Sequence, residues 1–390
     1  MKVALVAEWL DAWRGGAETS TLQFVHHLMK QDVELHVFTR SRPSPTRGLH
    51  VHTISGASMS RTRRSITFAH RVERLLRSDI FDVIHAISPC RCADIYQPRG
   101  GTVVEAIERN LALLKTSPGR RVKRYANHFN FKQRYLLALE RDLLGRQDGP
   151  LVVAISDYVV RQLKDHYALP DGRIRKIYNG VEPDRTAASE RDRHRAAIRR
   201  EFGIHEDHCL ALLIAHNFRL KGLQRWMEAL ALLVDRGVTG VRSLVVGKGD
   251  SERWLRLAAR LGITDYLTFT GPTERVSEFH HAADLLVHPT YYDPCSRVVL
   301  EAMVAGLPCV TTRWDGASEM IEDGSNGYVL DDPGDVQAIA DRVERLCSSD
   351  RCKRMGHAAS AVADRVSMAR HTAELLSLYE EMSAAGIAQR

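Results

Sequence analysis

The chain has 390 residues, 44% of them hydrophobic, which is typical of a globular protein of two or three domains. It contains no run of about 18 apolar residues, and its N-terminus has only a very short apolar run before the first acids, so neither a membrane span nor a secretory signal is expected. The net charge of +7 is uneven, because residues 1–185 carry 30 Lys and Arg against 19 Asp and Glu, a net charge of +11, whereas residues 186–390 carry 25 against 29. A basic half suits phosphate, anionic lipid or nucleic acid, with solvated surface charge as the simpler alternative.

The first half opens with the pattern strand, loop, helix. Residues 2–6 form a buried strand of the parallel type, and a loop over 8–16 leads into a helix at about 17–29. Gly15 and Gly16 lie just before this helix. Two glycines let the backbone approach a ligand, and the helix N-terminus offers free N–H groups to an anion. The pair therefore indicates an anion site, with a plain strand-to-helix turn as the alternative.

Further strands are expected at 33–38, 51–54 and 82–85, with a basic amphipathic helix at 60–77. The third of these strands ends at His85, and in open α/β sheets ligands bind beyond the carboxyl ends of strands. A lone histidine at a strand end is nevertheless more often packed than catalytic.

A basic and aromatic segment lies at 120–141, where Lys and Arg alternate with Tyr125, Phe129, Phe131 and Tyr135. Such a helix suits a membrane interface or a groove for an acidic substrate. No nucleic-acid-binding motif accompanies it, so nucleic acid is not expected as a partner. A helix with a packed aromatic face and a solvated basic face is the alternative.

A second α/β unit follows a charged segment at 182–200, which is the best candidate for a linker. Its strands are expected at 209–215, 243–246, 267–269, 284–287, 309–311 and 327–330. Each half is thus a βα repeat large enough for its own core.

Within this unit, residues 284–319 read as strand, loop, helix, strand and loop. Asp293-Pro294 is a helix-start pair, because Asp can cap a helix and Pro fits its first turn. Apolar residues then repeat at helical spacing until Gly306 ends the helix. Glu301 lies inside this helix, so the two carboxylates are expected to contact two parts of one extended ligand.

Seven motifs follow one another along the chain in an order and spacing that resemble a known family. They are GGAE at 15–18, FDVIHA at 81–86, the stretch 154–182, FRLKG at 218–222, VVGKGD at 245–250, TFTG at 268–271 and DPCSRVVLEAMVAGLPCVTT at 293–312. Over nearly the whole chain they resemble the retaining nucleotide-sugar glycosyltransferases of family 4 (glycosyl transferases group 1), and most of all the lipopolysaccharide-core glucosyltransferases. The resemblance implies the α/β GT-B fold, with two Rossmann-like domains facing across a cleft. It implies an acceptor-side domain over 1–185, joined by a C-terminal helix at about 370–390, and a nucleotide-sugar-binding domain over 186–369.

The resemblance also implies roles for individual residues. Arg219 and Lys221 of FRLKG would neutralise the donor diphosphate, a leaving group whose developing charge cations stabilise. Gly15 and Gly16 would bring the other domain's backbone to the same phosphates. Glu301 matches the acid that binds the ribose hydroxyls, which suits a carboxylate acceptor. The nucleotide base would be lined by Thr270, Gly271 and Pro272.

Several positions depart from the family pattern. Asp293 stands where the family has a longer Glu beside the donor sugar, so it is either the donor-site acid or only a helix cap. Three residues, Cys295, Ser296 and Arg297, replace a place that is often glycine, and their backbone N–H groups are expected to cradle the sugar or a phosphate. Ile87 replaces a second histidine, so that histidine's role does not carry over.

Two further acids complete the predicted site. Asp94 is similar in position to an acid of the lipopolysaccharide-core subgroup and is the candidate on the acceptor side. Glu319 is a weaker candidate in a loop expected to face the same cleft.

The resulting expectation is a metal-independent retaining glycosyltransferase with Asp293, Arg219, Lys221 and Asp94 as catalytic residues. It would move a hexose from a UDP- or GDP-linked sugar, its substrate, to a cell-envelope glycan or lipid-linked acceptor, with no cofactor. Seven cysteines without a CxxC pair indicate reduced thiols and no zinc site. The expected location is cytoplasmic and peripheral on the anionic inner membrane face. A nucleotide-sugar epimerase of GT-B fold and a non-catalytic nucleotide-sugar-binding protein are the alternatives.

Overall fold

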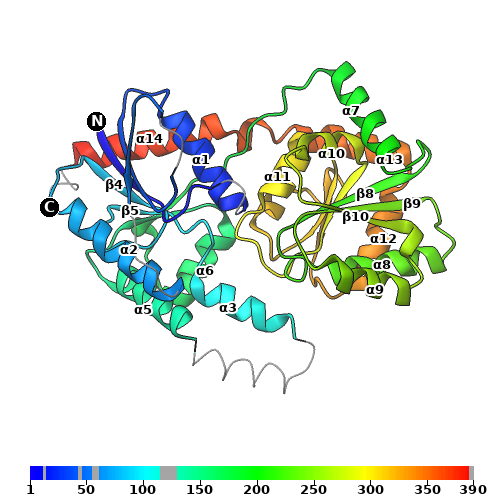
Figure 1. Cartoon of the computed structure of the whole chain (residues 1–390), viewed down its shortest axis with the longest axis horizontal. Helices are drawn as coiled ribbons and strands as arrows, with labels where there is room; N and C mark the ends of the chain where they lie inside the picture. The colour runs from blue at the N-terminus through cyan, green and yellow to red at the C-terminus, as the bar shows by residue number, and fades with distance from the viewer. Residues whose placement is uncertain (12–14, 43–45, 55–60, 115–129, 386–390) are drawn as a thin grey trace. The chain divides into compact units, whose positions relative to one another are not determined.

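A computed structural model describes residues 1–390 except 12–14, 43–45, 55–60, 115–129 and 386–390. The chain forms two compact units, Met1–Gly180 with Val366–Arg390, and Val181–Arg365. The family resemblance had implied divisions at 185 and about 370. Figure 1 shows each unit as a sheet with helices around it.

The N-terminal unit is built on a seven-stranded parallel sheet in the order β3-β2-β1-β4-β5-β6-β7. Its strands are β1 (Lys2–Val6), β2 (Glu34–Thr39), β3 (Leu49–Thr53), β4 (Val83–Ala86), β5 (Ile95–Tyr96), β6 (Leu151–Ala154) and β7 (Ile174–Lys176). Its helices are α1 (Gly16–Leu28), α2 (Arg61–Leu76), α3 (Val103–Ala112), α5 (Phe131–Gly145), α6 (Asp157–Tyr167) and α14 (Met368–Ala384).

The last helix belongs to the core of this first unit. Helix α14 packs against α1 and β4, as Figure 1 shows for the red and dark-blue helices. Phe24, Leu28, Leu375 and Tyr379 are all buried in the shared apolar cluster. Because a helix must cover its apolar face with another element, the end of the chain completes the core that its beginning leaves open.

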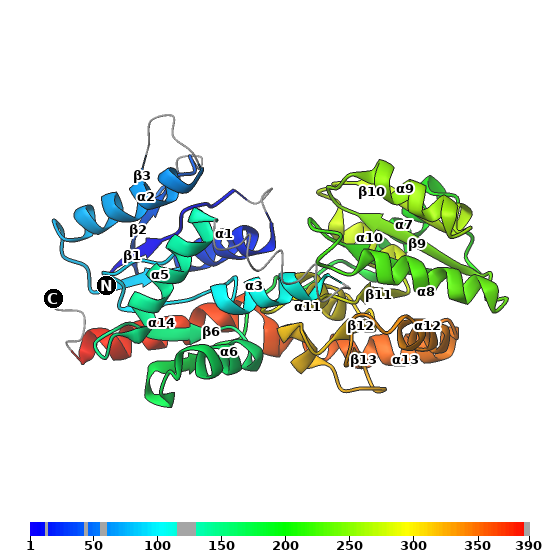
Figure 2. The same ribbon diagram turned by 90° about the horizontal axis from the view of Figure 1, so that it is seen from below.

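The C-terminal unit has a six-stranded parallel sheet in the order β10-β9-β8-β11-β12-β13. Its strands are β8 (Cys209–Ile214), β9 (Val241–Val246), β10 (Leu267–Gly271), β11 (Leu285–His288), β12 (Cys309–Thr312) and β13 (Gly327–Leu330). Its main helices are α7 (Ala188–Glu201), α8 (Leu223–Asp235), α9 (Ser251–Arg260), α10 (Val276–Ala282), α11 (Arg297–Val304), α12 (Val336–Leu346) and α13 (Ser349–Ser360). Figure 2 shows α8 beside α12, which contact each other.

The predicted linker at 182–200 is largely helical. Helix α7 packs on α10, and its Arg199 is buried, with Nη2 2.7 Å from Asp284 Oδ2. This charged sequence therefore docks through ion pairs with Asp284, which Arg195 also contacts at 3.1 Å. Among the described helices, none combines the length and apolar character that a membrane span requires.

Candidate functional site

The loops that follow β8, β11 and β12 come together at one edge of the C-terminal sheet. Strands β8 and β11 are neighbours although β9 and β10 lie between them in sequence, so the winding direction of the sheet reverses there. In open α/β sheets the ligand crevice lies beyond the carboxyl ends of the strands at such a point. The loops after β8 and β11 hold the predicted residues Lys221 and Asp293.

Gly222 fixes the loop after β8 against the loop after β11. It has a φ of +75°, and a Cβ there would lie 2.1 Å from the carbonyl oxygen of Pro289. Only glycine accepts both the left-handed backbone and this close approach. The Leu220 carbonyl also accepts from the Tyr291 N–H at 2.9 Å and the Thr290 hydroxyl at 3.3 Å. These contacts hold Lys221 at the junction of the two loops.

The Lys221 ammonium lies between two oxygens of the loop after β11. Its Nζ is 2.5 Å from Asp293 Oδ2 and 3.0 Å from the Tyr292 carbonyl oxygen. The side chains are 17% and 18% exposed for Lys221 and Asp293, respectively. An ammonium has three N–H donors, so these two contacts leave one for another acceptor. The arrangement is a preorganised, partly accessible positive charge.

The prediction that Asp293 begins a helix is wrong. Helix α11 begins at Arg297 with Ser296 in the capping position, and the Asp293 carboxylate accepts from the Cys295 N–H at 3.2 Å, which lies before the helix. The backbone of Asp293 instead pairs with the loop after β12, donating to the Trp314 carbonyl at 2.9 Å and accepting from the Gly316 N–H at 2.9 Å. Tertiary pairing thus holds residues 293–296 out of the helix, and a role as helix cap does not account for this acid.

Asp315 is a member of this constellation that the sequence analysis missed. It is fully buried, and its carboxylate accepts from the Ser296 N–H at 3.0 Å, the Ala317 N–H at 2.9 Å and the Thr311 hydroxyl at 3.0 Å. Burial, and then the charge of Asp293, raise the pKa of Asp315 to about 7. The carboxyl therefore fastens the loop that carries Asp293. The sequence signal for this residue was an Asp-Gly pair shortly after a buried strand, because such a pair marks a turn.

The prediction that the backbone N–H groups of residues 295–297 bind the sugar or a phosphate is wrong for two of the three residues. The Cys295 N–H donates to Asp293 and the Ser296 N–H to Asp315, at 3.2 and 3.0 Å. Both side chains are buried. These N–H groups are therefore used inside the loop, because two nearby carboxylates satisfy them first.

Glu301 lies one turn further along α11 and is partly exposed. Its Oε1 is 2.5 Å from Arg297 Nη2, and the side chains are 27% and 6% exposed for Glu301 and Arg297. Burial lowers the pKa of the neighbouring His280 to about 4, and the charge of Glu301 acts in the opposite direction. Arg297 therefore has a structural task, which is to orient a carboxylate that remains accessible.

The remaining candidates of this unit flank the same edge of the sheet. Arg219 is exposed, and in the described part of the chain it has no ion pair. Thr270 and Gly271 end β10 and Pro272 follows it, and the Gly271 carbonyl accepts from the Gly247 N–H at 2.9 Å. Glu319 is half-buried in the short helix Gly316–Met320 after β12.

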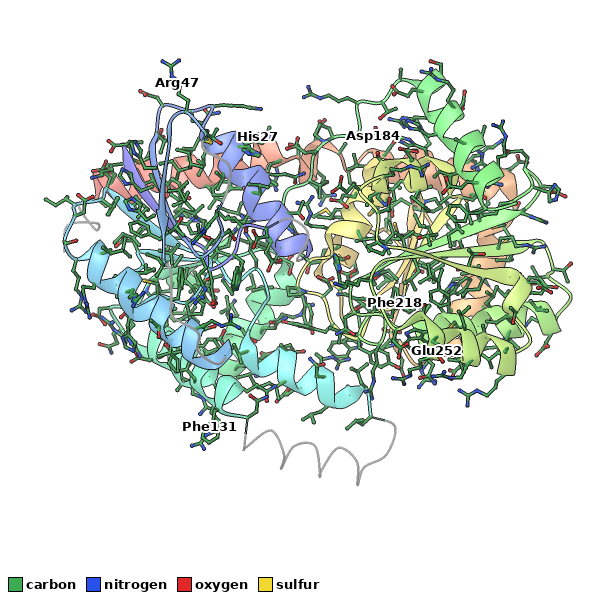
Figure 3. All side chains as sticks on the ribbon, in the orientation of Figure 1. His27, Arg47, Phe131, Asp184, Phe218 and Glu252 are labelled. Carbon is green, nitrogen blue, oxygen red and sulfur yellow. The ribbon has the colours of Figure 1, made fainter. Side chains whose placement is uncertain are left out.

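Phe218, in the loop after β8, packs against the loop after β9, and Figure 3 marks its place in the unit. A Cβ on Gly249 would lie 2.4 Å from its ring. The loops after β8, β9 and β10 are therefore packed together.

In the N-terminal unit, Gly15 precedes α1 and Gly16 is its exposed first residue. Within the described residues no side chain caps this helix, and its exposed start suits an anion site. His85 is fully buried, with Nδ1 2.6 Å from the Tyr379 hydroxyl, and burial lowers its pKa to about 3. His85 is therefore a packed, neutral histidine.

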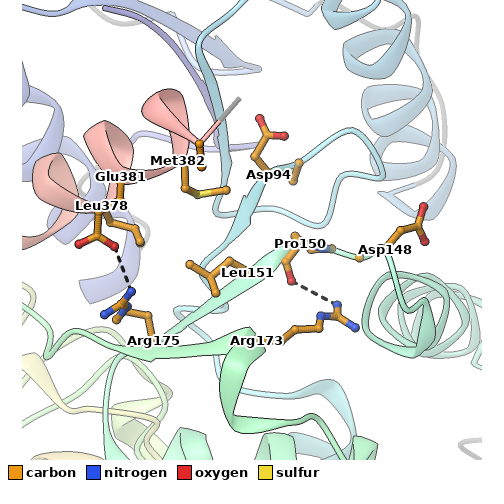
Figure 4. Close-up of a pocket in the computed structure, with 12 residues that line it drawn as sticks. Asp94, Asp148, Pro150, Leu151, Arg173, Arg175, Leu378, Glu381 and Met382 are labelled. Atoms are coloured by element: carbon orange, nitrogen blue, oxygen red, sulfur yellow. Dashed lines mark hydrogen bonds and ion pairs between the residues drawn. The ribbon is translucent and has the colours of Figure 1, made fainter. Parts of the chain in front are cut away.

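Asp94 lies at the amino edge of the N-terminal sheet, opposite to the edge at which Gly15 follows β1. Its Oδ2 accepts from the Ile84 N–H at 2.8 Å, and its backbone carbonyl accepts from the Leu151 N–H at 2.9 Å. It lines a cavity of about 380 Å³ that Figure 4 shows, together with Arg173, Arg175, Leu378, Glu381 and Met382. This placement gives Asp94 a structural task between strands and does not favour the predicted acceptor role.

The basic and aromatic segment falls partly outside the described residues, which exclude Tyr125 and Phe129. Phe131 begins α5 and is 75% exposed, whereas the Tyr135 hydroxyl is buried.

Comparison with protein families decides the class of the chain. Residues 14–185 match the model described as Glycosyltransferase Family 4, and residues 210–349 match that described as Glycosyl transferases group 1. The chain therefore carries one domain of each of these two glycosyltransferase families. The two matches fall on the two units, so the family sequence pattern and the division of the structure agree.

Relatives of this glycosyltransferase match over part of their length. It is 30% identical over 248 residues to the lipopolysaccharide glucosyltransferase WaaG of Escherichia coli, covering 64% of each chain. It is 32% identical over 252 residues to the D-inositol 3-phosphate glycosyltransferase of Corynebacterium jeikeium, covering 61% of this chain and 59% of that one. The matched region therefore spans about three fifths of these relatives.

Solved structures show that the glycosyltransferase has the GT-B fold. WaaG, a glycosyltransferase involved in lipopolysaccharide biosynthesis, superposes with a TM-score of 0.81 at 23% identity, over 97% of this chain and 99% of that one. HepE of Anabaena in complex with UDP and glucose superposes with a TM-score of 0.72 at 18% identity, over 98% and 100%.

Proposed function

We propose that the protein is a retaining glycosyltransferase that moves a hexose from a UDP- or GDP-linked sugar to a cell-envelope glycan or lipid-linked acceptor. The observation that carries this proposal is the Lys221 ammonium held by Asp293 and the Tyr292 carbonyl beyond the carboxyl ends of the strands. A cation at this place suits the one task that every nucleotide-sugar transfer requires, which is to stabilise the departing diphosphate.

The chemistry of the leaving group assigns the two cations. When the bond between the sugar and the diphosphate breaks, negative charge develops on the phosphate oxygens, and preorganised cations lower that barrier most. Lys221 offers its remaining N–H, and the exposed guanidinium of Arg219, two residues earlier in the loop, offers a planar fork that matches phosphate. In this proposal side chains supply the charge that the reaction requires, and no cofactor is assigned.

The two acids take different roles. Glu301 keeps one oxygen toward Arg297 and remains 27% exposed, which fits acceptance of the vicinal ribose hydroxyls. Asp293 lies beside Lys221 and is assigned to the donor sugar. Asp315 stands behind it as a positioning residue, because its carboxyl holds the Ser296 N–H of the same loop.

The printed names of the relatives select the first substrates to test. WaaG is named as a lipopolysaccharide glucosyltransferase, and HepE was crystallised with UDP and glucose. UDP-glucose is therefore the first donor, and a lipopolysaccharide-core glycolipid the first acceptor.

The basic N-terminal half supports a position on an anionic membrane. On and after α2, the exposed residues Arg74 and Arg77 lie beside Leu75 and Ile80, which are 41% and 85% exposed. Phe131, labelled in Figure 3, is a further exposed apolar residue of the same unit. Exposed cations with apolar side chains suit the interface of an anionic bilayer.

Vesicle binding tests this location. We expect co-sedimentation with phosphatidylglycerol vesicles at low salt and its loss in the double variant Arg74→Glu/Arg77→Glu. The matched control is Arg200→Glu, an exposed arginine on α7 of the other unit, which is expected to bind as the wild type does. Absence of wild-type binding at low salt would remove the membrane part of the proposal.

A donor panel tests the reaction itself. UDP-, GDP- and ADP-sugars are compared by thermal shift, and products formed with lipopolysaccharide-core acceptors are identified by mass spectrometry and by the anomeric signals in proton NMR. Retention of the anomeric configuration is expected. Conversion of the donor to an epimer without acceptor would identify an isomerase. Donor binding without turnover in single-turnover assays with any acceptor extract would identify a binding protein.

A further inference from the structure

Four side chains with metal-binding atoms lie on one face of β2 and β3, the two outermost strands at one edge of the N-terminal sheet. Side chains alternate along a strand, so Glu34 and His36 project from the same face of β2, and His50 and His52 from the same face of β3. The parallel register pairs His36 with His50 directly. Figure 2 shows β3 beside β2 at the end of the sheet, where β3 is the edge strand.

Three of these residues converge on one point. His36 Nε2 lies 2.9 Å from Glu34 Oε1, and the rings of His36 and His50 stack with centroids 4.6 Å apart. One ligand atom from each of Glu34, His36 and His50 lies within 4.8 Å of the others. Ligands of a tetrahedral zinc ion are about 3.4 Å apart, from metal–ligand lengths near 2.1 Å. Glu34 and His50 are exposed, so their side chains are free to make this small closure.

His52 provides the second layer that metal-binding histidines require. Its Nε2 lies 2.9 Å from His36 Nδ1, and its ring stacks on Phe38 with centroids 4.4 Å apart. With an ion bound at Nε2, His36 would carry its proton on Nδ1 and donate it to His52 Nε2.

We propose that Glu34, His36 and His50 form a binding site for a divalent transition ion of the zinc type, with water as the fourth ligand. Two imidazoles and one carboxylate are the donor set that such ions prefer over Mg²⁺ or Ca²⁺. The nearby ammonium of Lys2 is paired with Asp79 at 2.9 Å, so its charge is compensated. The ion would fasten the edge strand β3 to β2, and it takes no part in the proposed transfer reaction.

Metal titration of the tag-free protein tests this site. After chelator treatment, zinc chloride is titrated by calorimetry in competition with a chelator of known affinity, and Co²⁺ is followed by its visible absorption. We expect one ion per chain and a higher melting temperature of the wild type with zinc. Affinity should fall as the pH is lowered from 7.5 to 5.5, because protons compete for the imidazoles.

Variants locate the site. His50→Gln and Glu34→Gln should each weaken zinc binding by at least about tenfold. His52→Phe should weaken it by about 10- to 100-fold through the lost acceptor, whereas His52→Gln, which retains an acceptor oxygen, should stay within about threefold. The matched control is His205→Gln, an exposed histidine of the C-terminal unit, which should bind as the wild type does. Melting without metal checks that each variant folds.

Two results would overturn the proposal. One is wild-type zinc affinity in folded His50→Gln. The other is loss of binding in His194→Gln, because His194 lies 2.9 Å from His281 in the C-terminal unit and is the competing histidine pair. The proposal would also be overturned if the wild-type protein bound zinc no more tightly than free histidine does.

Discussion

Replacement of Lys221 by methionine removes the charge proposed to stabilise the leaving diphosphate while it keeps the length of the side chain. Loss of one preorganised electrostatic group lowers kcat by about 10²- to 10³-fold, equivalent to about 3–4 kcal/mol. The loss should appear in kcat as well as in kcat/KM, because the charge on the phosphates grows in the transition state.

Lys221→Met also lowers the stability of the folded protein, and this effect can be separated from the effect on catalysis. Asp293 is 18% exposed and would lose a partner at 2.5 Å, so the loss of stability lies between that of a surface pair and that of a buried pair, about 1–2 kcal/mol. For a domain of about 200 residues this lowers the melting temperature by about 2–8 °C. The double variant Lys221→Met/Asp293→Asn has no unpaired carboxylate and should recover most of that stability.

The assay measures UDP release against donor concentration at a temperature well below the melting points of all variants. Lys353→Met, an exposed lysine on α13, is the control and should match the wild type. If folded Lys221→Met keeps kcat within threefold of the wild type, the diphosphate role is refuted. If Lys221→Met has wild-type activity at every temperature at which circular dichroism shows that it is fully folded, Lys221 acts only through stability.

Three further predictions concern the surrounding residues. Gly222→Ala should cost at least about 2 kcal/mol in urea unfolding, through its left-handed backbone and the clash with Pro289, whereas Gly237→Ala, with a similar φ of +84° and open space, should cost about 1 kcal/mol. The pKa of Asp315 is about 7 in the folded protein and near 3.9 in the unfolded chain, so its contribution to stability is present below pH 4 and is lost as the pH rises through 7. Asp315→Asn should remove this pH dependence from melting curves measured between pH 4 and 8. A melting temperature that varies with pH as in the wild type would contradict this prediction. Glu301→Gln should raise the donor KM about tenfold with little change in kcat, since the ribose is bound equally in the ground and transition states; a fall in kcat alone would contradict the ribose role.

Much of the fold was predictable because local patterns and tertiary packing agree. The first four strands of the N-terminal sheet, the six strands of the C-terminal sheet and the helix after Gly16 lie within a few residues of their predicted places. Short runs of buried apolar residues between turn signals have few alternatives to a parallel strand. The family motifs also singled out Lys221 and Glu301, which lie in the loop after β8 and in the helix after β11.

The sequence alone determined two α/β units and the residue types at the ends of their strands. Only the tertiary structure decided what those residues contact. Asp293 reads as a helix start, yet its backbone pairs with residues 314–316, and the buried Asp315 takes the Ser296 N–H. Asp94 and His85 read as polar residues near strand ends, yet one holds the amino edge of a sheet and the other is packed against Tyr379, 294 positions away. Hydrogen-bonding groups are satisfied by whichever partner the folded chain brings nearest, and that partner is not encoded in local spacing.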